Sequence, residues 1–205
     1  MSRIRPFTAA DLDALYTIAL VTGDSGQDAT ALHSDGKLIG HIYSAPYGVL
    51  EPELAFVAED ELGVAGYVVG TTDTLAFAQK LERDWWPALR QRYPDPEAVA
   101  PEARTADQQR SFAIHHPETP PDAVVAAFPA HMHMNLLPRL RGQGIGTQLF
   151  DRWIETAHGL GARAVHVGVS PTNPGGLGFW QARGFVRLET PEGLWLGQQI
   201  RPRGR

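Results

Sequence analysis

The sequence contains no cysteine. Without thiols the protein forms neither disulfides nor thiolate metal sites, and an acyl intermediate on a cysteine is excluded. We expect no metal site. The lack of cysteine fits a reducing compartment, so we expect a cytoplasmic protein.

Long apolar runs and an excess of positive charge are also missing. No stretch approaches the roughly 18 apolar residues typical of a membrane-spanning helix, and the first residues lack the apolar segment of a secretion signal. We therefore expect neither export nor a membrane partner. The formal net charge of −5 at pH 7 argues against nucleic acid as a partner. We interpret the arginines of residues 201–205 as a solvated tail rather than a binding patch.

The sequence does contain a glycine-rich segment. It lies between a run in which apolar residues alternate and a run in which they recur at helical spacing. Gly142, Gly144 and Gly146 let a ligand approach the backbone and permit tight-turn dihedrals. The apolar residues that follow recur at helical spacing and are Leu149, Phe150, Trp153, Ile154 and Ala157. Unpaired N–H groups at the start of a helix favour a phosphate or pyrophosphate, and Arg139 and Arg141 add positive charge.

Two other kinds of phosphate-binding loop fit this segment less well. A dinucleotide-binding turn needs G-x-G-x-x-G early in a βαβ unit, followed by an acidic residue that closes the second strand. Here the pattern is G-x-G-x-G, it comes late in the chain, and that acidic residue is missing. A nucleoside-triphosphate loop needs a lysine after its last glycine, and Thr147 stands there instead.

The segment resembles the signature R/Q-x-x-G-x-G/A of the GNAT superfamily of N-acyltransferases, which stands here as Arg141-x-x-Gly144-x-Gly146. The family's second motif, N-x5-(L/F)-Y-x3-G-F, resembles residues 173–185, where Trp180 replaces the tyrosine. Much of the remaining chain resembles the acetyltransferase-like domain of animal O-GlcNAcase and its stand-alone bacterial relatives. That similarity covers Asp24–Leu32, His41–Tyr43, Pro46–Tyr47, Leu50–Pro52, Phe56–Asp60, Gly66–Tyr67, Gly70–Thr71 and Trp85.

The resemblance implies an α+β, three-layer fold with acetyl-CoA as cofactor. Its central mixed, mostly antiparallel, twisted sheet would have about seven strands flanked by helices. The animal domains are thought to have lost the glycine-rich loop and acetyl-CoA binding, whereas this chain keeps the loop. The cofactor-binding residues that we expect are Leu136, Leu137, Arg139, Arg141, Gly142, Gln143, Gly144, Ile145, Gly146, Thr147, Asn173, Phe179 and Trp180.

The pattern of the chain predicts the order of its elements. We expect a strand at 3–7, a helix at 12–21, a polar loop at 22–28, a short helical piece at 29–33, an irregular segment around Pro46, Gly48 and Pro52, and a hairpin of 54–58 with 64–70.

The family's fold passes directly from the third strand to the fourth, whereas here about 60 residues separate Gly70 from His131. We expect one domain over 1–205 with a helical insertion at about 72–125. Within it we predict a helix at 73–93 interrupted by Pro87, a helix at 102–115, and a return to the sheet at 117–125. We expect the insertion to narrow the acceptor entrance.

Candidate chemical groups lie on and around the fourth strand. His131, His133 and Asn135 share one of its faces, and a neutral imidazole can take a proton from an amine. We favour His133 as the base, although the alternation leaves open which face meets the acceptor. By the family resemblance, backbone N–H groups around Leu136 would polarise the thioester carbonyl.

Other side chains could contact the acceptor or the leaving group. Asp24 and Asp28 could bind an ammonium group, or they could be ordinary loop and cap residues. Because the indole of Trp180 is no useful acid, the coenzyme A thiolate would leave unprotonated or take a proton from Tyr43, Tyr47 or water.

Two functions remain open at this level. The first is an acetyl-CoA-dependent N-acetyltransferase, monomeric or homodimeric, in which an amine of a small molecule or peptide attacks directly in a ternary complex. The second is a module that binds acetyl-CoA or a protein partner without turnover. The intact phosphate loop favours cofactor binding under both.

Overall fold

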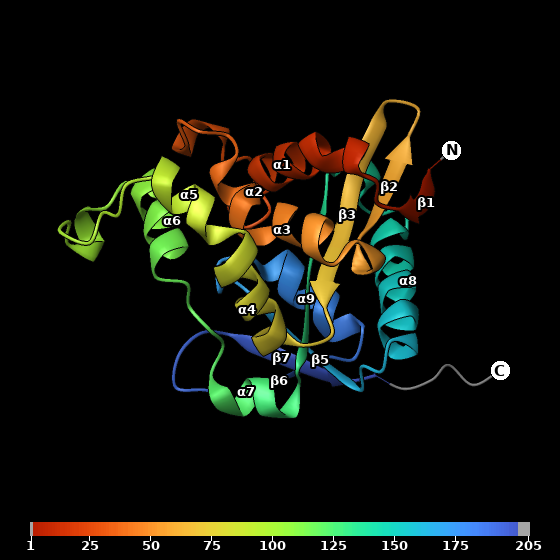
Figure 1. The fold of residues 1–205 in the computed structure, drawn as a ribbon. Helices are drawn as coiled ribbons and strands as arrows, with labels where there is room; N and C mark the ends of the chain where they lie inside the picture. The colour runs from red at the N-terminus through yellow and green to blue at the C-terminus, as the bar shows by residue number, and fades with distance from the viewer. Residues whose placement is uncertain (1, 201–205) are drawn as a thin grey trace.

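A seven-stranded sheet organises the protein in the computed structural model, which describes residues 2–200 (Figure 1). The strands are β1 (Arg3–Pro6), β2 (Phe56–Asp60), β3 (Gly63–Thr71), β4 (Ala130–Leu136), β5 (Ala164–Gly168), β6 (Val186–Arg187) and β7 (Trp195–Gln199). Their spatial order is β1-β2-β3-β4-β5-β7-β6, and only β4 and β5 run parallel. The predicted mixed, mostly antiparallel sheet is confirmed. The arginines of 201–205 lie outside the described residues.

Helices cover both faces of this sheet (Figure 1). One apolar core joins the sheet to α8 (Ile145–Gly159) and α9 (Pro174–Ala182). The other core joins it to α1 (Leu12–Val21), α3 (Ala45–Leu50) and α4 (Thr74–Asp84). The apolar stripe of α8 is buried as its periodicity predicts, and Trp153 at its centre is completely shielded from solvent.

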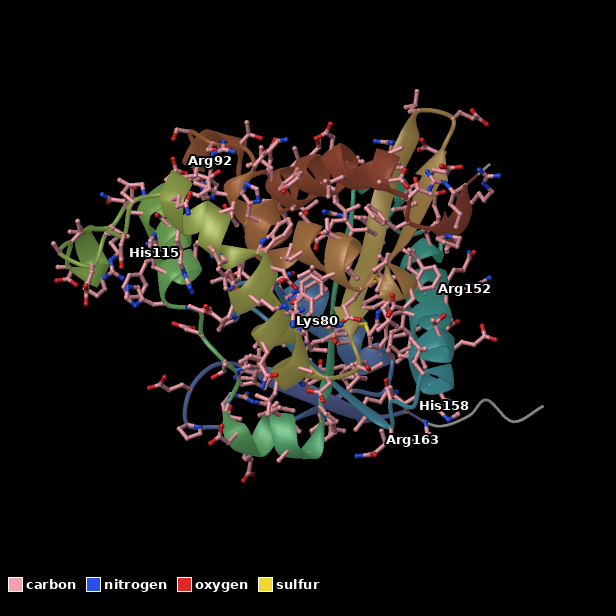
Figure 2. The ribbon with its side chains drawn as sticks, viewed as in Figure 1. Lys80, Arg92, His115, Arg152, His158 and Arg163 are labelled. Atoms are coloured by element: carbon pink, nitrogen blue, oxygen red, sulfur yellow. The ribbon has the colours of Figure 1, made fainter. Side chains whose placement is uncertain are left out.

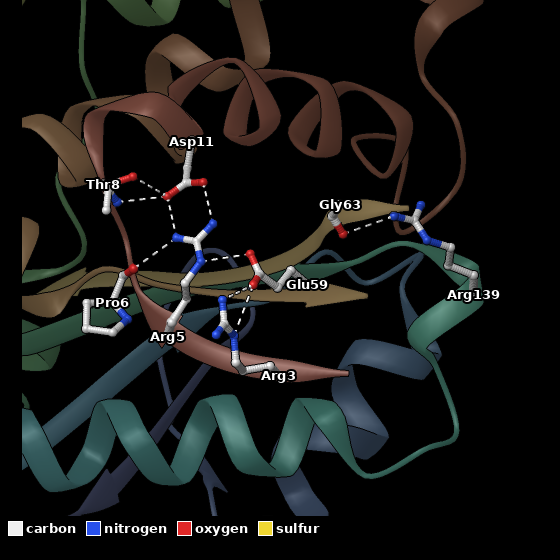
Figure 3. A network of polar contacts seen from close by, with 8 residues as sticks. All are labelled: Arg3, Arg5, Pro6, Thr8, Asp11, Glu59, Gly63 and Arg139. Carbon is white, nitrogen blue, oxygen red and sulfur yellow. Dashed lines mark hydrogen bonds and ion pairs between the residues drawn. The ribbon is translucent and has the colours of Figure 1, made fainter. Parts of the chain in front are cut away.

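A network of charged groups anchors β1 to its neighbours (Figure 3). Arg5 donates two hydrogen bonds of 2.7 Å to the carboxylate of Asp11 and a third, also 2.7 Å, to Glu59 on β2. Asp11 also accepts from the backbone N–H of Thr8, which caps the short 3-10 turn Ala9–Asp11 that precedes α1. The Arg5 guanidinium lowers the pKa of the buried Asp11 carboxyl to about 2.

The segment between α1 and β2 is more helical than its sequence predicts. Residues 29–33 form only a short 3-10 turn, Thr30–Leu32, while α2 (Leu38–Tyr43) and α3 occupy the region expected to be irregular. Pro46 does not break α3, because it lies in the first turn, where its missing N–H would have no partner. Gly40 marks close packing rather than a turn, since a Cβ there would lie 2.4 Å from the Tyr16 ring.

The insertion between β3 and β4 is helical, as predicted, but two of its boundaries differ. The break falls at Trp85, between α4 and α5 (Trp86–Arg92), with Pro87 in the first turn of α5. A capping box at Thr105 delays α6 (Ala106–His115) relative to the predicted start at 102. The expected return to the sheet at 117–125 is wrong, because Pro121 precedes a further helix, α7 (Asp122–Ala127).

The insertion packs against α2 and the segments that flank it. A separate apolar cluster formed by α2, α5 and α6 includes Leu38, Trp86, Leu89, Tyr93 and Ile114. Charged side chains also join the insertion to the rest of the domain. Lys80 binds Glu51 at 2.7 Å, and Arg92 binds Asp35 at 2.8 Å (Figure 2 labels both basic residues).

The network around Asp11 makes a prediction about stability. Asp11→Asn keeps the shape of the side chain and removes its charge, so we expect the free energy of unfolding at pH 7 to fall by about 2 kcal/mol, the equivalent of the pKa change. The control Asp13→Asn alters a carboxylate that is 90% exposed and should change stability by less than about 0.5 kcal/mol. Urea denaturation measures both.

The pH dependence of this effect has a defined sign. Because folding lowers the pKa of Asp11, its stabilisation is complete above the unfolded-state value and is lost as the pH falls from 3.8 towards 2. The difference between wild type and Asp11→Asn should therefore shrink across that range. A difference that stayed constant would contradict the charged pair as its cause.

Candidate active site

The site begins where β4 and β5 separate. The two strands pair only at Ala130 with Val165 and at His131 with His166. Beyond His131, β4 continues along β3, while β5 continues along β7. One edge of β4 therefore has no strand beside it. A cavity of about 1220 Å³ opens there, and its lining extends from the loop after α1 to the first turns of α8 and α9.

The free edge of β4 presents backbone N–H groups to this cavity. Leu137 donates its N–H to Ala65 on β3, and the carbonyl of Leu136 accepts from Arg141 on the opposite side. Because successive N–H groups of a strand point in opposite directions, those of Met134 and Leu136 face the gap. Both residues line the cavity. The edge can therefore donate hydrogen bonds to a carbonyl oxygen.

The glycine-rich loop forms the next part of the wall. Gly142 and Gly144 have φ of +73° and +76°, which side-chain-bearing residues rarely adopt, and a Cβ on either would project into open space. The backbone N–H groups of residues 142–147 donate to no other backbone group of the described chain. They form a cradle at the start of α8 that suits an anion. Gly146 instead permits close packing, since its Cβ would lie 3.2 Å from Leu136 and Phe179.

The structure brings most of the predicted cofactor-binding residues together. Those that line the cavity are Leu136, Arg141, Gly142, Gly144, Gly146, Thr147, Asn173, Phe179 and Trp180. Four others do not line it. Arg139 turns away to Asp60 and to the carbonyl of Gly63 (Figure 3), and Ile145 packs in the core. Gln143 donates to the Arg139 carbonyl, and Leu137 packs between the two sheet cores.

The second motif supports the wall from α9. Asn173 caps this helix by accepting the N–H of Gly176 at 2.8 Å. Trp180, at the position where the family has tyrosine, is 8% exposed and packs against Phe150 and Phe185. Asn173 therefore holds the Trp180 segment in place.

The polar face of β4 lies on the side of α1 and α3. His133 and Asn135 line the cavity, whereas His131 lies behind them. The hydroxyl of Tyr47 lies 2.7 Å from Nε2 of His131 and 3.1 Å from Nε2 of His133. Desolvation lowers the pKa of His133 to about 4 and that of His131 well below its usual value. Both imidazoles are therefore neutral near pH 7.

Asn135 is held by hydrogen bonds on both sides. Its amide oxygen accepts from Tyr67 at 3.0 Å, and its amide nitrogen donates to Thr22 at 2.6 Å. Its amide oxygen and its amide nitrogen therefore each have a partner within the protein. This arrangement suits a structural role at the cavity wall better than proton transfer.

The four predicted acceptor-binding residues divide into two pairs. Asp24 and Tyr43 line the cavity, and Tyr43 accepts a hydrogen bond from Arg110 of the insertion. Asp28 binds the N–H and hydroxyl of Thr30 instead, and Tyr47 lies behind the histidines.

None of residues 72–125 lines the cavity. The insertion packs its apolar face on α2 and contacts the cavity wall through Arg110 and Tyr43. That it narrows the acceptor entrance stays a prediction.

The sequence did not reveal the contacts by which the loop after α1 joins the cavity wall. Ser25 contacts Thr172 at 2.6 Å, and Arg141 donates to the carbonyl of Gly26 at 2.9 Å. The loop after α1 thereby reaches both the glycine-rich loop and the loop before α9. Its polar composition was visible in the sequence, but these contacts span more than 110 positions. Other lining residues that were not predicted include Thr22, Gln27, Tyr67 and Ser170.

Residues 2–200 contain neither a candidate metal site nor a candidate membrane-spanning helix. No group of three or more His, Asp or Glu side chains there is arranged to hold a metal ion. In that same range, no helix has the length and apolar character needed to cross a membrane.

Comparison with known proteins assigns the family. A model of the acetyltransferase (GNAT) family matches residues 78–185. The crystal structure of SsHAT superposes with a TM-score of 0.89 at 33% identity, covering 98% of this chain and 99% of that one. The chain belongs to the GNAT acetyltransferase family. This confirms the predicted fold and the resemblance drawn from the two motifs.

More distant relatives match nearly the whole length of this GNAT domain. Protein O-GlcNAcase of Rattus norvegicus is 25% identical over 198 residues, which cover 93% of this chain and 21% of the relative. The chain thus spans about a fifth of the length of the curated relatives it matches. A phosphinothricin acetyltransferase from Sinorhizobium meliloti, solved with acetyl-CoA, has a TM-score of 0.54 at 14% identity, covering 97% of this chain and 88% of that one. Acetyl-CoA is the cofactor of the family.

The glycine-rich loop makes a testable prediction about binding. Gly144→Val forces a branched side chain into a left-handed conformation and into the cradle, so acetyl-CoA affinity should fall by about tenfold or more. Gly159→Ala is the matched control at the other end of α8, where a Cβ meets no atom. Calorimetry measures affinity, and circular dichroism checks the fold. Unchanged affinity in a folded Gly144→Val protein would contradict the cradle.

Proposed function

We propose that this protein is an acetyl-CoA-dependent N-acetyltransferase in which an amine attacks directly within a ternary complex. The observation that carries the proposal is the continuity of the cavity. It joins the anion cradle at the start of α8, the free edge of β4 and the imidazole of His133. Membership of the acetyltransferase family supports acetyl transfer in general.

The residues of this chain fit acetyl-CoA along the cavity. The N–H groups of residues 142–147 and the Arg141 guanidinium would hold the pyrophosphate. Asn173, Phe179 and Trp180 would flank the pantetheine arm. When bound, acetyl-CoA supplies an acetyl thioester, whose carbonyl carbon gains a bond to nitrogen and loses its bond to sulfur.

The protein's own groups supply the remaining steps. The N–H groups of Met134 and Leu136 polarise the thioester oxygen. Asp24, a carboxylate on the cavity wall, would attract the protonated amine. The amine would lose its first proton to solvent, and His133 would accept the second proton, which the nitrogen loses as it attacks. Tyr43 or water would donate a proton to the leaving thiolate, and Tyr43 would then regain its proton from water. Among the tyrosines proposed for this role, Tyr43 lines the cavity and Tyr47 does not.

Trp180 is the observation that favours a second function, binding without turnover. A tyrosine there could protonate the thiolate, whereas an indole N–H cannot. To separate the two functions, the purified protein is incubated with acetyl-CoA and a panel of amines and peptides while free thiol is followed. Amine-dependent release of thiol supports the transferase. Binding of acetyl-CoA without release across the panel supports the binding module.

The role of His133 predicts a specific loss of rate. His133→Ala should lower the rate of acetyl transfer about 100-fold or more, the usual effect of removing a general base, and leave acetyl-CoA affinity intact. The control His158→Ala changes a histidine near the other end of α8 (Figure 2) and should alter neither quantity. Transfer by His133→Ala at the wild-type rate would make His133 a packing residue.

The lowered pKa of His133 predicts the pH profile. Only neutral His133 accepts a proton, and its pKa of about 4 makes it neutral throughout the physiological range. The rise of kcat/KM with pH should therefore follow the pKa of the acceptor amine, while the limb from His133 lies near pH 4. Two acceptors whose amines differ in pKa test this. A shared limb near pH 6.5, the ordinary histidine value, would contradict it.

A further inference from the structure

A chain of hydrogen bonds leads from the cavity into the sheet behind it. His133 meets the Tyr47 hydroxyl through Nε2 at 3.1 Å, and that hydroxyl meets Nε2 of His131 at 2.7 Å. Nδ1 of His131 then lies 2.7 Å from the hydroxyl of Thr74. The chain ends where this hydroxyl lies 2.7 Å from the carbonyl oxygen of Pro129.

The far end of the chain sets its direction. A carbonyl oxygen only accepts hydrogen bonds, and a threonine hydroxyl has a single hydrogen. Two oxygens 2.7 Å apart without a hydrogen between them would repel each other, so the Thr74 hydrogen points to Pro129. The Thr74 oxygen must therefore accept from His131, which places a hydrogen on Nδ1 of that ring.

The same rule fixes each following link. A neutral imidazole has one N–H and one lone pair, so Nε2 of His131 accepts the hydrogen of the Tyr47 hydroxyl. The Tyr47 oxygen then has no further hydrogen to donate, and it accepts from Nε2 of His133. This leaves the lone pair of His133 on Nδ1, which has no hydrogen-bond partner among the described residues, on a ring that lines the cavity.

We propose that Thr74, His131 and Tyr47 hold His133 in its Nε2–H tautomer, so that Nδ1 is the nitrogen that accepts the proton of the substrate amine. The catalytic part of this inference rests on the proposed function, whereas the tautomer itself does not. Thr74, His131 and Tyr47 are positioning residues. If the chain ran in the opposite direction, Nδ1 of His133 would carry a hydrogen and could only donate.

The proton balance of the step is complete. As nitrogen bonds to the acetyl carbon and the carbon–sulfur bond breaks, the amine proton moves to Nδ1 of His133. The resulting imidazolium keeps its Nε2–H hydrogen-bonded to the Tyr47 oxygen, and this bond stabilises the positive charge. His133 then returns to the neutral form by releasing the Nδ1 proton to water.

The tautomer is measurable without any reaction. In a long-range ¹H–¹⁵N correlation spectrum of histidine-labelled protein at pH 7.5, without acetyl-CoA, His133 should show a pyrrole-type Nε2 and a pyridine-type Nδ1. The loss of these signals in His133→Ala assigns them. The opposite pattern in the wild-type protein would overturn the inference, whatever the activity.

Variants test whether the chain is the cause. Tyr47→Phe should shift the His133 signals towards the other tautomer and lower kcat by about tenfold or more, with acetyl-CoA affinity unchanged. The matched control is Tyr16→Phe, which removes a similar buried bond of 2.9 Å to Nδ1 of His41. It should leave the His133 signals and kcat unchanged. An unaltered His133 tautomer in Tyr47→Phe would overturn the inference.

A second pair of variants acts at the far end and covers the case in which Tyr47→Phe fails to fold. Thr74→Val removes the oxygen that accepts from His131, so both His131 and His133 should populate a mixture of the two tautomers. Thr74→Ser keeps the oxygen and should show the wild-type tautomers. No difference between these two variants would overturn the inference. If the expected spectrum is found but no amine is acetylated, the proposed function fails and the tautomer assignment stands.

Discussion

The divergence of β4 and β5 after His131 is the constraint on which the rest of the site depends. A continuous sheet would pair the edge of β4 with a neighbouring strand and leave its N–H groups unavailable. Because β5 follows β7 instead, that edge faces a cavity, and the chain between the two strands delivers the glycine-rich loop and α8 to one end of it. A single break in strand pairing thus creates both the carbonyl-binding edge and the room for a long cofactor.

The second constraint is the polar face of β4. Placing His131, His133 and Asn135 inside a sheet is unfavourable unless their polar atoms are paired. Tyr47 and Tyr67 provide partners from the helical side and from β3. The same bonds that make this face tolerable also orient the imidazole at the cavity. A substitution that removes one of these hydrogen bonds would therefore affect both the stability of the sheet and the orientation of His133.

The insertion contributes to the site without entering it. Its helices bury their apolar side chains against α2, and Arg110 donates to the hydroxyl of Tyr43. The wall formed by α2 is consequently held from both sides, by α1 and by the insertion. The extra length between β3 and β4 thus acts on the cavity by fixing the position of one helix.

The sequence by itself determined the features that depend on near neighbours in the chain. The left-handed glycines at 142 and 144, the apolar stripe of α8 and the alternation along β4 follow from local backbone geometry, and all three are present. Only the tertiary structure decided which groups meet. Arg139 resembles a phosphate ligand in the sequence but pairs with Asp60, which lies 79 positions away. Tyr47 reaches the histidines across 84 and 86 positions, because contacts between distant segments are set by packing rather than by local pattern.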